Sequence, residues 1–295
     1  MGHGETTEVF SGVKERAVRL LLEQQGRMPV ELYTPALSMA RPTLPALRRE
    51  LRALASPDHA SALQWFFKTG PGGYGEGDRF LGVRMPALRR LARANRELAT
   101  DDALTLLRSR WHEERLLALL LLIEHYRRAD AAGKDAIHRA YLANTRYVNN
   151  WDLVDASAEH LVGAHLAPGD AALLDRLSAS ESVWERRIAM IATFHWIKRG
   201  EYALALRVAE RLVHDPHDLI HKAVGWMIRE VGKRDREVEE RFLGVHAPTM
   251  PRTMLRYAIE RFPEPLRRRY MLRDAAPSTR RAPTPRARRS RPPRA

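Results

Sequence analysis

The feature that most constrains the fold is a helical segment marked by tryptophan that recurs along the chain. Four such segments, each basic and apolar, follow one another at intervals of about 33 to 42 residues, with their tryptophans at Trp111, Trp151, Trp184 and Trp226. Apolar residues are spaced by three and four, and nothing alternates like a strand for more than a few residues. This period is typical of paired-helix repeats, which stack into a curved array with an extended concave surface. The sequence therefore predicts an all-α chain with a single solenoid domain over residues 40–272.

Helix boundaries follow from the same spacing and from the breaks between segments. Short Pro- and Gly-containing breaks, such as residues 168–169 and 199–200, separate neighbouring segments as in antiparallel helix pairs. The predicted helices cover residues 43–56, 59–69, 85–97, 101–110, 111–128, 133–147, 150–166, 169–180, 182–199, 201–214, 218–234, 236–244, 250–262 and 264–272.

Two flanking segments lack this pattern. Residues 1–39 form an N-terminal extension that is either disordered or carries one short helix over residues 13–24. Residues 273–295 form an Arg/Pro-rich tail with eight Arg against one Asp, so about half of the net charge of +14 lies there. Because this composition cannot build a core, the tail is predicted to be a disordered extension, a non-specific phosphate contact, or both.

The overall charge and the lack of cysteine narrow the function classes. A net charge of +14 and a pI near 10.6 favour a polyanionic partner. The absence of Cys excludes disulfides, thiol nucleophiles and cysteine metal sites, and suits a cytosolic protein. The longest apolar run, residues 116–123, is too short to span a membrane and fits a buried helix. The N-terminus shows no signal-peptide pattern.

The run NNWDLVD, residues 149–155, sets an aromatic ring and a carboxylate one helical turn apart at the start of a predicted helix. Residues four apart share a helix face, so Trp151 and Asp155 project side by side. Asp155 falls near the first turn, where the helix dipole favours the ionised carboxylate. The apolar residues that point away from this pair and can pack are Leu153, Val154, Leu161 and Ala164. This face is a candidate site for a cation carried on a polyanion.

The next repeat begins with Trp184 and carries Arg186 and Arg187 in its first turn. Equivalent turns line up in a stacked array, which predicts that Arg187 or Arg186 approaches Trp151 and Asp155. Two interpretations remain open, an Arg–Asp ion pair between neighbouring helices and an arginine that binds a phosphate beside the carboxylate. Trp226, which follows a Gly, is likewise either a core residue or an exposed ring.

Two other motifs give weaker indications of function. The glycine-rich run at residues 68–79 lacks the Gly-Lys-Ser/Thr ending of a P-loop and follows no strand. It is interpreted as a tight interhelical connection, with close approach to a backbone phosphate as the alternative. His214, His217 and His221 have a spacing like that of metal ligands, but Pro216 breaks the helix between the first two. We predict no metal and no cofactor.

Five runs, taken in order, resemble the AlkD-type DNA alkylation-repair glycosylases over about residues 42 to 263. They are residues 65–84, 150–155, 183–187, 222–230 and 251–262. The resemblance implies a right-handed α-solenoid of HEAT-like antiparallel helix pairs with a concave basic face that binds double-stranded DNA. It also implies excision of N7- and N3-alkylated purines, such as 7-methylguanine and 3-methyladenine, without metal or cofactor.

The resemblance also implies roles for individual residues. By motif, Asp155 corresponds to the family's catalytic Asp, and Trp151 and Trp226 to the two Trp residues that flank the deoxyribose of the lesion. Arg187 corresponds to the Arg at the lesion backbone. Where many members have a Tyr shortly before the Lys of the N-terminal motif, this chain has two Phe residues, so the stacking surface is kept and the hydroxyl is lost. The other residues expected to contact DNA are Phe66, Lys68, Arg84, Arg186, Lys222, Arg252 and Arg256.

These residue types suit the implied chemistry. An alkylated N7 or N3 purine is already cationic, so it leaves without a general acid and the sugar becomes oxocarbenium-like. An ionised carboxylate near C1′ stabilises that cation, and aromatic faces add cation–π attraction. We therefore predict a monofunctional DNA glycosylase that is cytoplasmic, nucleoid-associated when bound to DNA, and monomeric. The alternatives are a non-catalytic HEAT-like repeat protein that binds damaged or branched DNA, and a protein-binding scaffold whose charge belongs to its tail.

Overall fold

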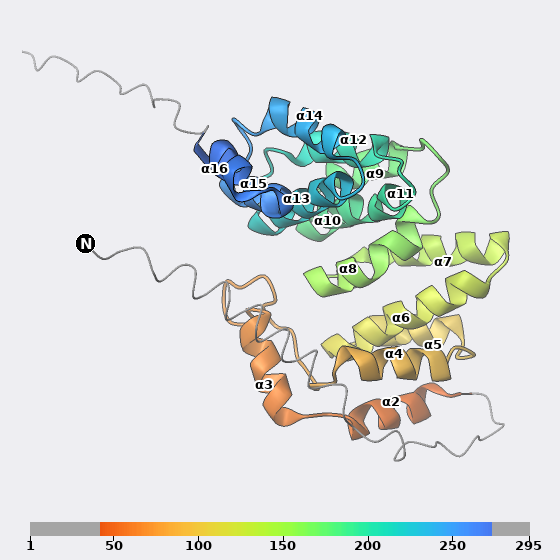
Figure 1. The fold of residues 1–295 in the computed structure, drawn as a ribbon. Helices are drawn as coiled ribbons and strands as arrows, with labels where there is room; N and C mark the ends of the chain where they lie inside the picture. The colour runs from red at the N-terminus through yellow and green to blue at the C-terminus, as the bar shows by residue number, and fades with distance from the viewer. Residues whose placement is uncertain (1–41, 273–295) are drawn as a thin grey trace, which may run out of the picture. The chain divides into compact units, whose positions relative to one another are not determined.

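The computed structural model describes residues 42–272, and every regular element in that range is helical (Figure 1). The sole β-type pairing within it is an isolated bridge between Arg79 and Trp111. The prediction of an all-α chain is confirmed for this part. The predicted N-terminal extension, with its boundary at residues 39 and 40, and the Arg/Pro-rich tail lie outside the described residues.

Each predicted segment contains a helix, with bounds within a few residues of those expected. The α-helices are α2 Leu44–Ala53, α3 Pro57–Phe66, α4 Met85–Ala94, α5 Thr100–Leu107, α6 His112–Arg128, α7 Ala131–Ala143, α8 Trp151–Ala158, α9 Ala172–Ser178, α10 Val183–Ala192, α11 Phe194–Ile197, α12 Ala203–Leu212, α13 Asp218–Gly232, α14 Arg236–His246, α15 Arg252–Ala258 and α16 Glu264–Leu272. Short 3-10 turns, η3 Thr145–Tyr147 and η5 Ile259–Arg261, and a π-helical turn, η4 Glu159–Gly163, complete the set.

Two predicted helices are interrupted. The segment expected over residues 182–199 divides into α10 and α11 at Thr193, whose hydroxyl donates to the Met190 carbonyl at 2.7 Å. A hydroxyl that bonds a nearby carbonyl competes with the regular helix ladder. The segment expected over residues 150–166 begins as α8 and continues as η4, where the Ala164 N–H donates to the Glu159 carbonyl at 2.9 Å. Spacing of apolar residues carries no information on either break.

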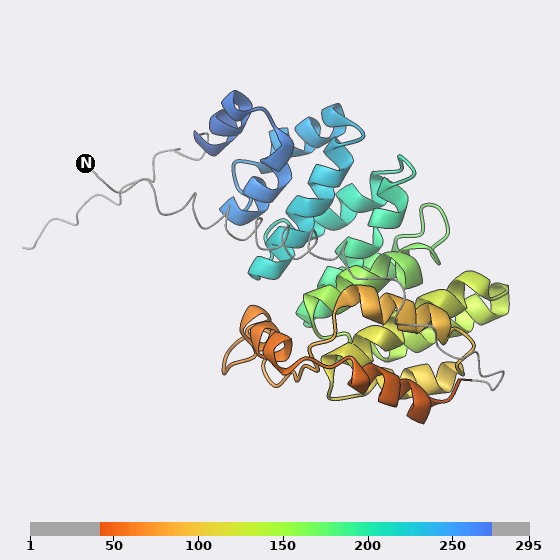
Figure 2. The same cartoon turned by 60° about the horizontal axis from the view of Figure 1, so that its bottom comes forward.

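Helices that are close in sequence pack against one another. One series of contacts runs α4 to α6, α6 to α8, α8 to α10, α10 to α13 and α13 to α15. A second set packs on this series, with α5 and α7 on α6, α9 on α10, and α12 and α14 on α13. Figures 1 and 2 show the same succession, since the colour changes gradually from one helix to its neighbour. The first series brings α8, α10 and α13 side by side.

The middle of α6, residues 116–123, is apolar on every side and lies at the centre of the core. Leu117, Leu119, Leu121 and Leu122 are fully buried, because α4, α5, α7 and α8 all pack around this helix. The predicted burial of residues 116–123 is therefore confirmed. Across residues 42–272, no helix has the combination of length and apolarity that crossing a membrane requires.

The first turn of α6 anchors the connection between α3 and α4. The carboxylate of Glu113, itself buried, accepts the backbone N–H groups of Leu81, Gly82 and Val83 at 2.8, 2.7 and 3.2 Å. Gly82 has φ +82°, and a Cβ there would lie 2.1 Å from the Ser56 carbonyl oxygen, so only glycine fits. This anchor fixes the glycine-rich loop against the start of α6, next to the start of α8.

Candidate functional site

Asp155 of α8 forms a two-pronged ion pair with Arg187 of α10. Nε and Nη2 of Arg187 donate to the two carboxylate oxygens at 2.9 and 2.8 Å. Nη1 donates to the backbone carbonyl of Leu219, at the start of α13, at 2.5 Å. The prediction that an arginine of the next repeat approaches Asp155 is therefore confirmed for Arg187. The form it takes is the inter-helix ion pair, one of the two interpretations left open by the sequence.

Asp155 is largely buried but remains accessible. Its side chain is 18% exposed, whereas that of Arg187 is 6% exposed. Burial raises the pKa of Asp155 above its usual range, although the neighbouring Arg187 guanidinium opposes this shift. The helix-dipole argument predicted the opposite direction, because the sequence does not show how much of the carboxylate is desolvated. The two-pronged geometry, with both oxygens accepting, is that of the ionised form.

Trp151 stands at the first position of α8 in a cluster of aromatic rings. Its indole stacks on Phe67 with centroids 5.3 Å apart, and meets the edge of Phe66 at 6.0 Å. Phe67 is buried, whereas Phe66 is 50% exposed. The Asn150 side chain caps the helix by accepting the Trp151 backbone N–H at 2.8 Å. As predicted, Trp151 and Asp155 share one side of α8 while Leu153 and Val154 pack into the core, and the stacking surface continues through both Phe residues.

Tyr74 adds a hydroxyl to this cluster that the sequence analysis missed. Its Oη accepts the indole N–H of Trp151 at 3.2 Å and donates to the Phe66 carbonyl at 3.4 Å. The glycine-rich loop makes this contact, because it folds back on the end of α3. A Cβ at Gly75 would lie 2.4 Å from the Phe67 carbonyl oxygen, so this return requires glycine. The loop is thus the interhelical connection that was expected, and it also orients Trp151.

A buried histidine connects the loop to α8. His112, at the start of α6, has Nδ1 at 2.9 Å from Asp78 and Nε2 at 2.7 Å from Asp152. Burial alone would lower the pKa of this ring, but the carboxylates of Asp152 and Asp78 together raise the pKa of His112 to about 9. A protonated ring donates from both nitrogens, one to each acid. Arg115 also binds Asp78, so the loop carboxylate has two cationic partners.

The second predicted tryptophan lies apart from this cluster. Trp226 is half-buried on α13, donates to Glu230 at 3.3 Å, and has the Phe194 ring 6.0 Å away. Within residues 42–272, no ring contact or hydrogen bond joins Trp226 to Asp155 or Trp151. The sequence left open whether Trp226 is a core residue or an exposed ring. The structure lies between the two, since the ring packs against the core and stays partly exposed.

The predicted basic contacts fall into two groups. Arg186 binds the buried Asp215 at 2.6 Å and two backbone carbonyls, so the structure gives it a role in holding the chain together rather than a free guanidinium. The other five basic positions are exposed or half-buried at the surface of helices and loops. Lys222 pairs with Asp218 at 2.6 Å, Arg252 and Arg256 donate within the C-terminal helices, and Lys68 and Arg84 are exposed.

Two of the three histidines considered as metal ligands contact the backbone instead. His217 caps α13 by accepting the Leu219 N–H at 3.1 Å, and His221 lies 2.5 Å from the Asp215 carbonyl. In the part of the chain that the structure describes, no three His, Cys, Asp or Glu side chains are grouped so that they could hold a metal ion.

Comparison with known proteins assigns the chain to a family. The family model described as "DNA alkylation repair enzyme" matches residues 47–262. The chain belongs to the DNA alkylation repair enzyme family. A solved structure, a predicted DNA alkylation repair enzyme from Enterococcus faecalis, is similar with a TM-score of 0.55 and 16% identity, covering 71% of this chain and 97% of that one. No curated protein matches. The region that matches this DNA alkylation repair family contains Trp151, Asp155, Arg187 and Trp226.

Proposed function

We propose that the protein is a monofunctional DNA glycosylase that hydrolyses the N-glycosidic bond of cationic N7- and N3-alkylated purines in duplex DNA. The observation that carries the proposal is Asp155, a carboxylate fixed by Arg187 yet still 18% exposed, on the same helix face as an aromatic ring. Membership of the DNA alkylation repair enzyme family supports this substrate class.

The ion pair with Arg187 is compatible with catalysis by Asp155. An ionised carboxylate has about four lone-pair sites, and the two bonds to Arg187 occupy two of them. The remaining sites can face a sugar that becomes positive as its purine leaves, or orient a water toward C1′. Since Arg187 is 6% exposed, we assign it the role of holding Asp155 in position rather than of a primary phosphate contact.

The aromatic residues complete the proposed site. The Trp151 face, with the exposed Phe66 beside it, would lie against the deoxyribose and contribute about 0.5–2 kcal/mol of cation–π attraction. Trp226 lies on α13, which is separated by α10 from the helix that carries Trp151, and it would flank the lesion opposite Trp151. Because a cationic purine needs no acid to leave, no general acid, metal or cofactor enters the proposed reaction.

The proposed fold of the DNA-binding domain, residues 40–272, is a right-handed α-solenoid of HEAT-like antiparallel helix pairs with DNA on its concave face. The unbroken succession of contacts from α4 to α15 supports a repeat array. We leave Arg186 out of the DNA contacts because Asp215 and two carbonyls occupy it. The residues that we propose as contacts are Phe66, Lys68, Arg84, Lys222, Arg252 and Arg256.

A single assay tests the proposed function. The full chain, in excess over a duplex that carries 7-methylguanine, is expected to release the free base faster than the spontaneous rate. A duplex with uracil, whose neutral base is a poor leaving group without an acid, should give no release. Release that stays at the background rate, or that is equally fast from the uracil duplex, would refute the proposal.

One observation favours a second candidate. The Asp155–Arg187 pair is also what a purely structural link between α8 and α10 would look like. In that case the protein would be a non-catalytic HEAT-like repeat that binds damaged or branched DNA. Tight binding of 7-methylguanine duplex without any base release would favour this function over the glycosylase.

Tyr74 gives a prediction within the site. The change Tyr74→Phe removes the acceptor for the Trp151 indole and the donor to the Phe66 carbonyl. A hydrogen bond of this kind contributes about 0.5–1.5 kcal/mol, so base release at saturating protein should slow about 2- to 10-fold. Affinity for undamaged duplex should change little.

Tyr147→Phe is the matched control for Tyr74→Phe, since Tyr147 contacts Arg146 through its ring and its hydroxyl forms no hydrogen bond with any residue of 42–272. An equal rate loss in both variants, or unchanged release by Tyr74→Phe, would remove Tyr74 from the site.

A further inference from the structure

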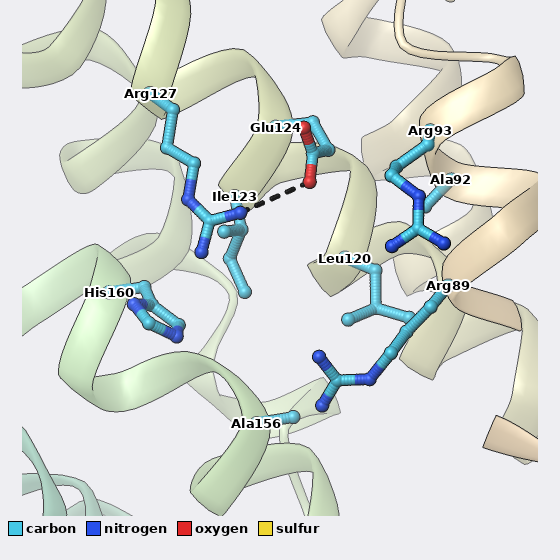
Figure 3. A pocket seen from close by; sticks show the side chains of 9 residues that line it. All are labelled: Arg89, Ala92, Arg93, Leu120, Ile123, Glu124, Arg127, Ala156 and His160. Atoms are coloured by element: carbon cyan, nitrogen blue, oxygen red, sulfur yellow. Dashed lines mark hydrogen bonds and ion pairs between the residues drawn. The ribbon is translucent and has the colours of Figure 1, made fainter. Parts of the chain in front are cut away.

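A small arginine-lined hollow lies on α4, α6 and the end of α8, apart from the residues already described (Figure 3). Its volume is about 80 Å³. Figure 3 shows the side chains of Arg89 and Arg93 on one side and those of Arg127 and His160 on the other, with their polar ends turned toward the space between them. Leu120, Ile123 and Ala156 supply apolar walls. A space of this size, lined by three arginines and a histidine beside apolar walls, suits a small anion.

The charges around this hollow are not balanced. Among the residues of 42–272, Arg89 and Arg93 have no carboxylate within ion-pair distance. Arg127 pairs with Glu124 at 3.2 Å, and this is the sole acid that lines the hollow. Three guanidinium groups against one carboxylate leave an excess of two positive charges. Without a bound anion, like charges gathered in this way repel one another.

The π-helical turn sets the position of His160. It replaces the regular ladder after α8 with an i to i+5 bond between Glu159 and Ala164. Turns of this type inside helices frequently occur at functional sites. Gly163 lets this turn pack closely against the end of α10, since a Cβ there would lie 2.0 Å from the Ala192 carbonyl oxygen. A wider hollow of about 430 Å³ shares Ile123, Arg127 and His160, so the small one opens onto a larger surface.

We propose that Arg89, Arg93, Arg127 and His160 bind one backbone phosphate of the DNA strand. The inference rests on the proposed function, because it takes duplex DNA as the ligand. Arginine presents donors in a planar fork that matches phosphate oxygens, and three forks around one hollow can meet several oxygens of one group. His160 adds a ring nitrogen from the far side.

The pocket lies close enough to Asp155 for one DNA strand to contact both of them. His160 follows Asp155 by five residues along α8 and η4, which is a rise of roughly 7.5 Å along the helix axis at about 1.5 Å per residue. Ala156, next to Asp155 in sequence, lines the pocket. A nucleotide at Asp155 would therefore have a phosphate of its own or of a near neighbour within reach of this pocket.

The double variant Arg89→Gln/Arg93→Gln tests the inference. Within residues 42–272 neither arginine has an ion-pair partner to lose, so we expect the fold to be unaffected. Each phosphate neutralised contributes about 0.9 to the slope of log K against log salt concentration. The double variant should therefore show a slope shallower by about 0.9, with at least about tenfold weaker binding to undamaged duplex at low salt. The matched control is Arg90→Gln, an exposed arginine of α4 that does not line the pocket.

A second measurement checks the pocket directly. Inorganic phosphate alone, added to the full chain, should shift the His160 ring signal in a saturable way in NMR spectra, and the double variant should lose this shift. A salt slope equal to that of Arg90→Gln would overturn the inference. So would a phosphate-dependent His160 shift without any change in DNA affinity, since the pocket would then take a free anion only.

Failure of this inference and failure of the proposed function give different results. If the wild-type chain releases 7-methylguanine and the double variant binds DNA as the control does, the glycosylase stands and the pocket is wrong. If the double variant shows the shallower salt slope but no chain releases base, the pocket stands and the enzymatic function is wrong.

Discussion

Replacing Asp155 by Asn is expected to slow 7-methylguanine release by about 10²- to 10³-fold, because the amide cannot supply the negative charge that faces the sugar. Asn keeps the size of the side chain and one acceptor oxygen, so the position next to Arg187 remains filled. Binding of undamaged duplex should be nearly unchanged, since the charge acts on a cation that forms only as the bond breaks. Single-turnover release and an equilibrium binding titration measure the two quantities separately.

Two further variants separate catalysis from folding. Asp155→Asn leaves Arg187 without its carboxylate, and breaking a buried pair costs about 3–5 kcal/mol. The double change Asp155→Asn/Arg187→Gln removes both members of the pair, and it should be folded and equally slow. Asp101→Asn, an exposed carboxylate of α5, is the matched control and should release base at the wild-type rate. Undiminished release by a folded Asp155→Asn protein would exclude Asp155 as the catalytic group.

The second large effect is a loss of stability at alkaline pH caused by His112. The pKa of its ring is about 9 in the folded chain, against 6.5 for an ordinary histidine. The folded state therefore holds this proton more tightly than the unfolded state, and the stabilisation is complete below pH 6.5 and lost as the pH rises through about 9. The difference corresponds to about 3 kcal/mol in the free energy of unfolding. Urea unfolding at a series of pH values measures it.

His112→Gln should remove this pH dependence, and it should destabilise the protein by about 3–5 kcal/mol at neutral pH because Asp78 and Asp152 lose their cation. Burial raises the pKa of Glu239 to about 8, so this group also makes the free energy of unfolding fall as the pH rises. The difference between wild type and His112→Gln cancels that contribution. His214→Gln, at an exposed histidine, is the control. A His112→Gln protein with the same slope as wild type above pH 7 would disprove the assignment.

The parts of the site that could be predicted are those that depend on local spacing. The shared face of Trp151 and Asp155 follows from residues four apart on a helix, and the approach of Arg187 follows from the alignment of neighbouring repeats. The helices themselves follow from apolar residues spaced by three and four.

The parts that could not be predicted depend on contacts between distant segments. His112 meets acids 34 and 40 residues away, and Tyr74 meets Trp151 across 77 residues. No periodic pattern marks such pairs, and the loop that presents Tyr74 takes its path from close backbone approaches at glycine. The direction of the Asp155 pKa shift was missed for a related reason, since desolvation comes from the whole surrounding structure.

The three donor nitrogens of Arg187 couple the acid to two other helices at once. Two of them hold Asp155 on α8, and the third holds the Leu219 carbonyl, in the first turn of α13 that His217 caps. A substitution at His217 that displaces the start of α13 would therefore shift the Arg187 side chain. That shift would turn the Asp155 carboxylate away from the orientation needed for catalysis. Substitutions that never touch DNA could in this way silence the chemistry while leaving affinity intact.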